Sequence, residues 1–150
     1  MKLIILLFVL VNLTVSSVMA ESKLTLTSLE KQHYKEMTSK EISELLLGKT
    51  ITLKDLLSKA VYEVKINNEG LTKKKVIKEK SPETLTSIEY NSRAALLTDG
   101  LELVVKGNKI ITSDGVRTYM STLYKKQNII YGVRDIDHDS VNFQIIIENK

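Results

Sequence analysis

Residues 38–53 read TSKEISELLLGKTITL, and within them the hydrophobic period changes from that of a helix to that of a strand. Thr38 as N-cap and Glu41 three residues later form a capping box, in which each side chain satisfies a backbone donor at the first turn. An Ile and two Leu follow on one helix face, and Gly48 stands where a left-handed residue ends a helix. This stretch predicts a helix at 39–47 that leads directly into a strand.

Alternation of apolar and polar residues continues through most of the chain that follows. It is found at 62–66, 101–105, 129–133 and 141–147, and it predicts strands with one covered face. In the third of these strands the apolar face is predicted to be Ile129, Tyr131 and Val133.

Glycine-containing turns separate these strands. Asp99-Gly100 and Asp114-Gly115 are hairpin signals, and Gly107 lies between them. Short turns force neighbouring strands to pair antiparallel. We therefore predict an α+β fold, in which a short N-terminal helix precedes an antiparallel β-meander of seven to nine strands. Closure into a small barrel or half-barrel removes exposed edges. Residues 91–100 fit a helix and a strand equally well.

The first 20 residues have the pattern of a signal peptide. Lys2 is followed by an apolar run at 3–11, and Val18-Met19-Ala20 ends at a small residue, which places cleavage after Ala20. The apolar run is too short to span a bilayer. We therefore predict export to the periplasm or the outside of the cell, with no transmembrane segment after cleavage. The remaining chain divides into an N-terminal segment at 21–37 and a single α+β domain at 38–150.

Composition excludes several classes of protein. The 150 residues contain no Cys, which excludes disulfide frameworks, thiolate metal sites and cysteine catalysis. Six Tyr, two Phe and no Trp favour a packed interior over a roomy aromatic pocket. Whether the barrel is filled or hollow stays open.

A run of lysines is the first candidate for a binding surface. It comprises Lys73, Lys74, Lys75 and Lys78. Charge on both faces of a strand is typical of an exposed sheet edge, and the same charge suits an envelope protein or an acidic envelope component. No aromatic residues interleave the lysines as a nucleic-acid platform needs, so a nucleic-acid partner is not expected.

An acidic loop is the second candidate. Asp135, Asp137 and Asp139 alternate as at the start of a calcium-binding EF-hand. Ser140 occupies the position that requires Gly in that motif. The alternative is a solvated hairpin loop, because aspartates favour turns.

Catalytic motifs are sparse. The two histidines are His33 and His138, and the sequence has no nucleophile elbow, zinc-protease motif or phosphate-binding glycine loop. No catalytic residue and no cofactor is therefore assigned.

Residues 37–53, MTSKEISELLLGKTITL, resemble the opening of small exported bacterial domains of unknown function. The resemblance implies a helix leading into a lipocalin-like antiparallel sheet, and it carries over no functional residue. Those domains continue with Gly-rich and Trp-containing strands, where this chain has its lysine run. The leading hypothesis is an exported, non-catalytic binding or interaction module of the bacterial envelope. The alternatives are a lipocalin-like carrier of a small ligand and a hydrolase without a recognisable motif.

Overall fold

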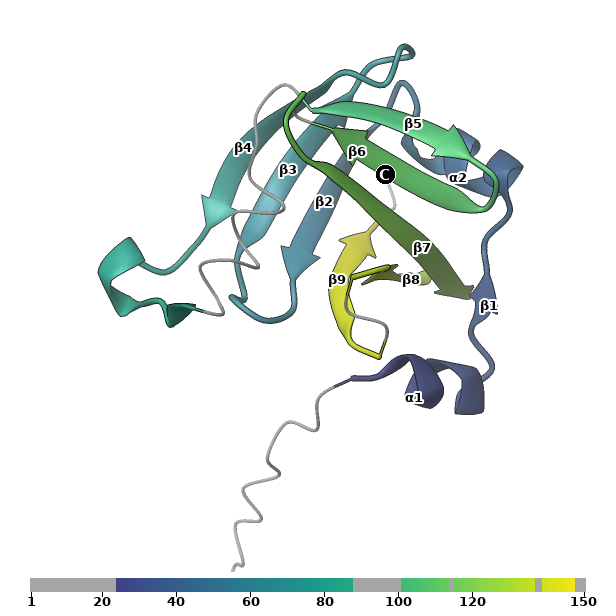
Figure 1. Ribbon diagram of the computed structural model, residues 1–150, viewed down its shortest axis with the longest axis horizontal. Helices are drawn as coiled ribbons and strands as arrows, with labels where there is room; N and C mark the ends of the chain where they lie inside the picture. Colours follow the sequence, from purple (N-terminus) through teal and green to yellow (C-terminus); the bar gives the residue numbers. More distant parts are fainter. Residues whose placement is uncertain (1–23, 88–100, 114, 137–138, 148–150) are drawn as a thin grey trace, which may run out of the picture.

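The computed structural model describes residues 24–87, 101–113, 115–136 and 139–147 (Figure 1). The predicted signal peptide at 1–20 lies outside these residues, and so does the segment 91–100.

The described part of the chain is mostly β-structure with two short α-helices. The helices are α1 (Leu26–Lys31) and α2 (Ser39–Leu46), and a 3-10 turn, η1, lies at Pro82–Thr84. The strands are β1 (Lys35–Glu36), β2 (Thr50–Asp55), β3 (Val61–Ile66), β4 (Thr72–Lys78), β5 (Glu102–Lys106), β6 (Lys109–Ser113), β7 (Thr118–Lys126), β8 (Ile129–Arg134) and β9 (Val141–Ile146).

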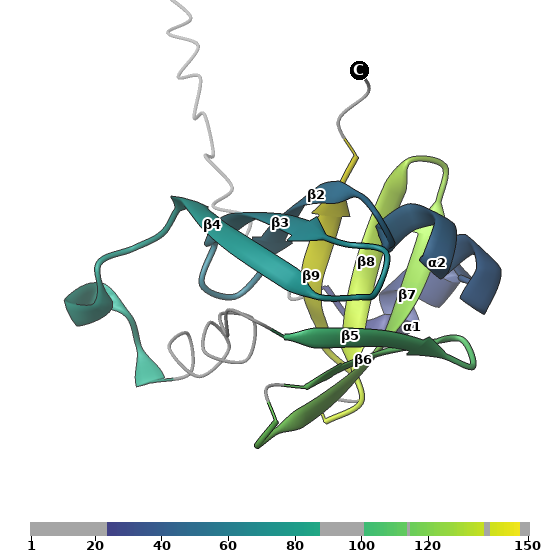
Figure 2. The ribbon, with the colours of Figure 1, turned by 90° about the horizontal axis from the view of Figure 1, so that it is seen from above.

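The strands form one antiparallel sheet that curls into a half-barrel (Figure 2). Its order is β4-β3-β2-β9-β8-β7-β6-β5, and β1 pairs with β7 outside this path. The predicted helix followed by an antiparallel sheet is confirmed, with a balance that is mostly β rather than an even α+β mixture. The strands form two meanders, β2-β3-β4 and β5-β6-β7-β8-β9, rather than the single one predicted. The two meanders join because β9 returns to pair with β2.

The two edge strands of the sheet, β4 and β5, meet at one end only. The backbone N–H of Leu103 donates to the carbonyl of Gly70 at 2.9 Å, and the N–H of Thr72 donates to the carbonyl of Leu101 at 3.1 Å. Gly70 has a φ of +88°, and a Cβ built there would lie 2.0 Å from the Leu103 carbonyl oxygen. Only glycine therefore permits this approach of the two edges.

The main core fills the concave side of the half-barrel. Its buried side chains come from α2 and from strands on both sides of the curl, and they include Ile42, Leu46, Tyr62, Leu123, Ile130 and Ile145. The alternating burial of β3 shows why its sequence forms a one-faced strand. Burial of this apolar surface is the main source of stability.

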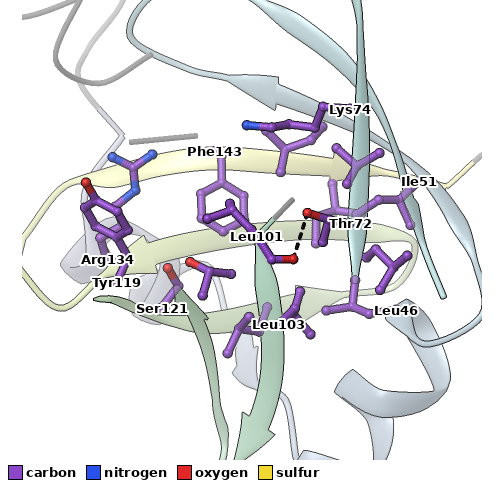
Figure 3. A pocket seen from close by; sticks show the side chains of 16 residues that line it. Leu46, Ile51, Thr72, Lys74, Leu101, Leu103, Tyr119, Ser121, Arg134 and Phe143 are labelled. Carbon is purple, nitrogen blue, oxygen red and sulfur yellow. Dashed lines mark hydrogen bonds between the residues drawn. The ribbon is translucent and has the colours of Figure 1, made fainter. Parts of the chain in front are cut away.

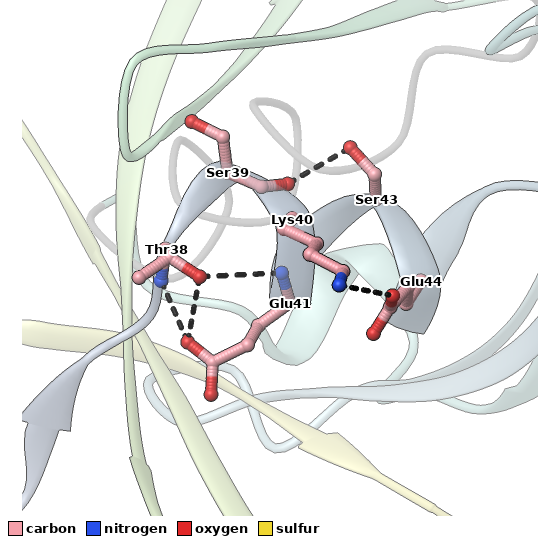
Figure 4. A network of polar contacts seen from close by, with 6 residues as sticks. All are labelled: Thr38, Ser39, Lys40, Glu41, Ser43 and Glu44. Atoms are coloured by element: carbon pink, nitrogen blue, oxygen red, sulfur yellow. Dashed lines mark hydrogen bonds and ion pairs between the residues drawn. The ribbon is translucent and has the colours of Figure 1, made fainter.

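Helix α2 lies over one end of this core and is capped as its sequence predicts (Figure 4). The N–H of Thr38 donates to Oε2 of Glu41 at 2.9 Å, and the N–H of Glu41 donates to Oγ1 of Thr38 at 3.4 Å. The hydroxyl of Thr38 also donates to Oε2 of Glu41, at 2.9 Å. The two bonds that the carboxylate accepts from Thr38, the backbone one first, lower the pKa of the Glu41 carboxyl. The N–H of Ser39 donates to Oδ1 of Asn108 at 3.2 Å, which ties the helix to the β5–β6 turn.

A second, smaller core lies on the convex side, between α1 and strands β8 and β9. It contains Leu29, Val133 and Val141, with Tyr34 and Tyr131 packed against it. Helix α1 begins at a capping box formed by Thr25 and Ser28. The segment 24–37 thereby packs on the same sheet as the rest of the chain.

The predicted covered face of β8 is confirmed only in part. Tyr131 and Val133 pack into the convex core, whereas Ile129 is 41% exposed. The other face of the strand is covered as well, because Ile130 is fully buried in the main core. The concave face of this strand reads Ile130, Gly132, Arg134. The Phe143 ring from β9 occupies the space above Gly132. The apolar surface at this position therefore comes from β9, and the sequence of β8 alone does not show it.

Candidate functional site

A pocket of about 80 Å³ opens from the concave side of the half-barrel (Figure 3). Most of its lining is apolar and belongs to the main core, including Leu46 from α2, Ile51 from β2, Val64 from β3, Leu103 from β5 and Phe143 from β9. Strands far apart in sequence build it together, since the curl of the sheet brings their inward faces opposite one another.

Polar side chains occupy part of the same wall. They are Thr72, Lys74, Thr112, Tyr119, Ser121 and Arg134. Thr112 and Tyr119 are half-buried, whereas Thr72, Ser121, Arg134 and the Nζ atom of Lys74 are buried. A mainly apolar cavity with a few convergent polar groups is the usual form of a small-ligand site.

Strand alternation turns Lys74 into the half-barrel. It lies between Lys73 and Lys75, which are exposed on the other face of β4, and it pairs in register with the inward-facing Val64. Its Nζ is 5.9 Å from the centroid of the Tyr62 ring. A cation over an aromatic face is attracted by the ring quadrupole, and this contact helps to hold the lysine head in the wall.

Arg134 reaches the pocket from the central strand β8, at the end of that strand. It is 8% exposed, and its backbone N–H donates to Oδ1 of Asn142 at 2.7 Å. The β8–β9 register shifts between Gly132 and Val133, and Asn142 is the residue left without a Cα partner. A β-bulge of this kind re-aims side chains: Phe143 faces the pocket while Val141 joins the convex core.

The volume limits what the pocket can hold. About 80 Å³ is well below the roughly 300–1,000 Å³ of pockets for drug-sized ligands. It is also below the roughly 150 Å³ of an apolar cavity that accepts benzene. The pocket therefore fits a short apolar group of a few carbon atoms.

The predicted lysine surface is divided by the structure. Strand β4 is an edge strand, as the charge pattern predicts. Lys73, Lys75 and Lys78 are exposed on it, whereas Lys74 belongs to the pocket. Val76 and Ile77 on the same strand are 44% and 56% exposed. The exposed side chains of β4 thus form a basic surface with two apolar residues.

The structure describes only part of the predicted acidic loop. Asp135 is half-buried and forms an ion pair with Lys109, and its N–H donates to the carbonyl of Met120 at 3.0 Å. Asp139 is exposed. Asp137 and His138 lie outside the described residues, so metal binding by the loop stays a prediction. Within the described ranges, no three His, Cys, Asp or Glu side chains gather as metal ligands.

Two tyrosines on the convex side have shifted acidity. Burial raises the pKa of Tyr34 and of Tyr124, and the nearby Tyr131 and Glu36, respectively, raise it further. Both phenols therefore stay neutral at physiological pH, which suits packing between α1 and the sheet rather than nucleophilic chemistry.

Sequence reasoning missed Arg134, Tyr119 and Ser121 as pocket residues. For Arg134 the signal is the shared parity of positions 130, 132 and 134, which places it on the face that carries the buried Ile130. Parity alone does not show which face of a strand is concave.

Comparison with known protein families, with curated proteins and with solved structures finds no match. None of the helices in the described part of the chain has the length and apolarity needed to cross a membrane.

Proposed function

We propose that this chain is a non-catalytic binding module that holds the short apolar group of a ligand in the pocket of its half-barrel. The observation that carries the proposal is the pocket itself, which is mainly apolar and carries a few polar side chains on part of its wall. The ligand is smaller than the cargo of a roomy lipocalin-like carrier, because the volume is about 80 Å³.

Two features of the fold support a preformed site. Leu46 of the capped helix α2 closes one end of the pocket, and the Gly70–Leu103 contact holds the edge strands together beside it. A preformed pocket loses less conformational entropy on binding than one that must be assembled.

Methyl NMR tests the proposal and contains its own control. Butan-1-ol is titrated into protein labelled at Ile, Leu and Val methyl groups. We expect saturable shifts at Ile51, Val64 and Leu103, which line the pocket, and none at Leu29 and Val133 in the convex core. Equal shifts in both clusters, or none in either, would contradict the proposal.

A pocket-filling variant provides a second check. Val64→Phe places a larger apolar side chain at the pocket wall, and we expect it to abolish saturable binding. Val133→Ile adds one methylene to the convex core and should leave binding unchanged. Binding that survives Val64→Phe would place the ligand elsewhere.

A second candidate function is docking of an acidic envelope component on the basic surface of β4. The observation that favours it is the exposure of Lys73, Lys75 and Lys78 together on an edge strand. Positive charge gathered in this way attracts acidic polymers, with an affinity that falls as salt rises.

Binding to poly-L-glutamate at several salt concentrations tests this docking. The test variant combines Lys73→Gln, Lys75→Gln and Lys78→Gln. The control variant combines Lys31→Gln, Lys40→Gln and Lys106→Gln, at lysines that are exposed on other elements. We expect only the β4 variant to lose binding. An equal loss of poly-L-glutamate binding in both variants would show that binding depends on net charge and not on the surface of β4.

We further propose that the chain acts in the periplasm or outside the cell after cleavage following Ala20. The support is the tripartite pattern of residues 1–20. Mass spectrometry of protein recovered from a bacterial host's periplasm is expected to show Glu21 as the first residue. An intact N-terminus on membrane-bound protein would contradict cleavage.

A further inference from the structure

We infer that the pocket selects an amphipathic anion, whose short apolar part enters the half-barrel while its anionic head is bound by Lys74 and Arg134. This inference rests on the proposed function and names the chemical class of its ligand. The head is a carboxylate or an anion of similar size.

The wall of the pocket carries two cations from different parts of the sheet. Lys74 comes from the edge strand β4 and Arg134 from the central strand β8. Opposite charges interact more strongly beside apolar walls than in open water, since the local dielectric constant is lower. Arginine and lysine form charge-assisted hydrogen bonds with carboxylates, and these are stronger than bonds between neutral groups.

The two cations lie toward the same side of the pocket. Figure 3 shows Lys74 and Arg134 there with Phe143 between them, and Leu46 and Leu103 toward the other side. A ligand with an anionic head and a short apolar tail matches this arrangement in a single orientation. A neutral alcohol of the same length uses the apolar part alone, and an ammonium head is repelled by both cations.

Hydroxyl groups in the same wall add donors for an anion. Tyr119 and Ser121 lie beside Arg134 on the neighbouring strand, where Ser121 pairs in register with Arg134. A hydroxyl can donate to a carboxylate oxygen. The anion would therefore meet two charged and two neutral donors that come from three strands.

A head-group series with a fixed tail tests the inference. Butanoate, butan-1-ol and butylammonium are titrated into the full-length mature protein, and the dissociation constants are read from the pocket methyl groups of Ile51 and Leu103. We expect butanoate to bind at least about tenfold more tightly than butan-1-ol, the ratio that one charge-assisted hydrogen bond provides. Butylammonium is expected to bind most weakly.

Variants locate the head group. Lys74→Met should reduce the preference for butanoate over butan-1-ol about tenfold. Lys73→Met and Lys75→Met remove the same charge from the outer face of the same strand and should keep the preference. Arg134→Met removes the second cation. If that variant does not fold, Arg134→Lys replaces it in the test, because it keeps the charge but loses the planar fork of the guanidinium group.

The outcomes separate this inference from the proposed function. If no butyl compound binds, both fail. If butan-1-ol binds as tightly as butanoate, the binding module stands and the anion selectivity is refuted. If butanoate is preferred but Lys73→Met lowers the preference as much as Lys74→Met, general surface charge is responsible and the assigned head-group site is wrong.

Discussion

Replacement of Gly70 by Ala should open the contact between the two edge strands. The φ of +88° is costly for any residue with a Cβ, and the added carbon would lie 2.0 Å from the Leu103 carbonyl oxygen. That oxygen belongs to the backbone, so no side-chain rotation relieves the clash. The chain can accept alanine only if β5 moves away from the start of β4.

The magnitude follows from what that movement breaks. A left-handed conformation costs an L-residue about 1–2 kcal/mol. Separation of the edges also breaks the Leu103-to-Gly70 bond and two bonds from Thr72, through its N–H and its hydroxyl, to the Leu101 carbonyl. At about 1 kcal/mol for each bond, the total cost of Gly70→Ala is about 4–5 kcal/mol.

Gly115→Ala is the matched control. Gly115 has a φ of +84°, close to that of Gly70, but no atom lies within 4 Å of a Cβ built there. Gly115→Ala should therefore lower the free energy of unfolding only by the cost of the left-handed backbone conformation, about 1–2 kcal/mol. Urea unfolding followed by circular dichroism gives both values. Hydrogen exchange at the Thr72 and Leu103 amides should accelerate in Gly70→Ala only.

Equal destabilisation by the two alanine variants would refute the reasoning. It would mean that the close approach of Gly70 to Leu103 contributes nothing beyond backbone strain. Protection of the Thr72 amide in Gly70→Ala would likewise show that the edges stay joined.

Three further predictions concern a capped helix, a buried aspartate and a ring contact. Thr38→Ala should cost about 1 kcal/mol and return the pKa of Glu41 toward its ordinary value. Because the pKa of Glu41 is lower in the folded than in the unfolded state, the carboxylate stabilises the fold at pH values above the unfolded-state pKa. This stabilisation is lost as the pH falls through the folded-state pKa. Carboxyl NMR and unfolding at several pH values check this. Asp55 is fully buried, and its Oδ1 accepts bonds from the N–H groups of Leu57 and Ser58 at 2.9 and 2.8 Å. Asp55→Ala should lower the free energy of unfolding in urea by about 2–4 kcal/mol, and Asp55→Asn should lower it less. Gly132→Ala places a Cβ 2.0 Å from the Phe143 ring and should cost about 1–3 kcal/mol, part of which Phe143→Leu restores in the double variant.

Each of these has an outcome that contradicts it. An unchanged Glu41 titration in Thr38→Ala would remove the capping bonds as the cause of the shift. Equal losses in the Ala and Asn variants at position 55 would show that the side-chain acceptor is unimportant. If the changes in the free energy of unfolding caused by Gly132→Ala and Phe143→Leu simply add in the double variant, the clash with the Phe143 ring is not the cause of the loss.

Local features of the fold were predictable because their physics is local. The Thr38 capping box and the Gly48 helix stop follow from neighbouring residues alone, and both are present, with Gly48 at a φ of +69°. The edge position of β4 was also predictable, because lysines on both faces are incompatible with a central strand.

The binding site was less predictable because it depends on which face each strand presents. Lys74 was grouped with its neighbours as a surface charge, although strand alternation places it in the pocket. Arg134 was not predicted as a site residue, and the second covered face of β8, which carries the buried Ile130, was not predicted either. Phe143 supplies the apolar surface that Gly132 lacks, and a contact between two strands cannot be seen in either one alone.

The sequence by itself determined the elements of this protein: a capped helix, one-faced strands, tight turns and the absence of cross-links. These follow from hydrophobic period, turn chemistry and composition, which act over a few residues. Only the tertiary structure decided how the sheet curls, where its edges meet and which polar side chains share a pocket. Those properties depend on contacts between residues far apart in the chain, such as Gly70 with Leu103 and Gly132 with Phe143.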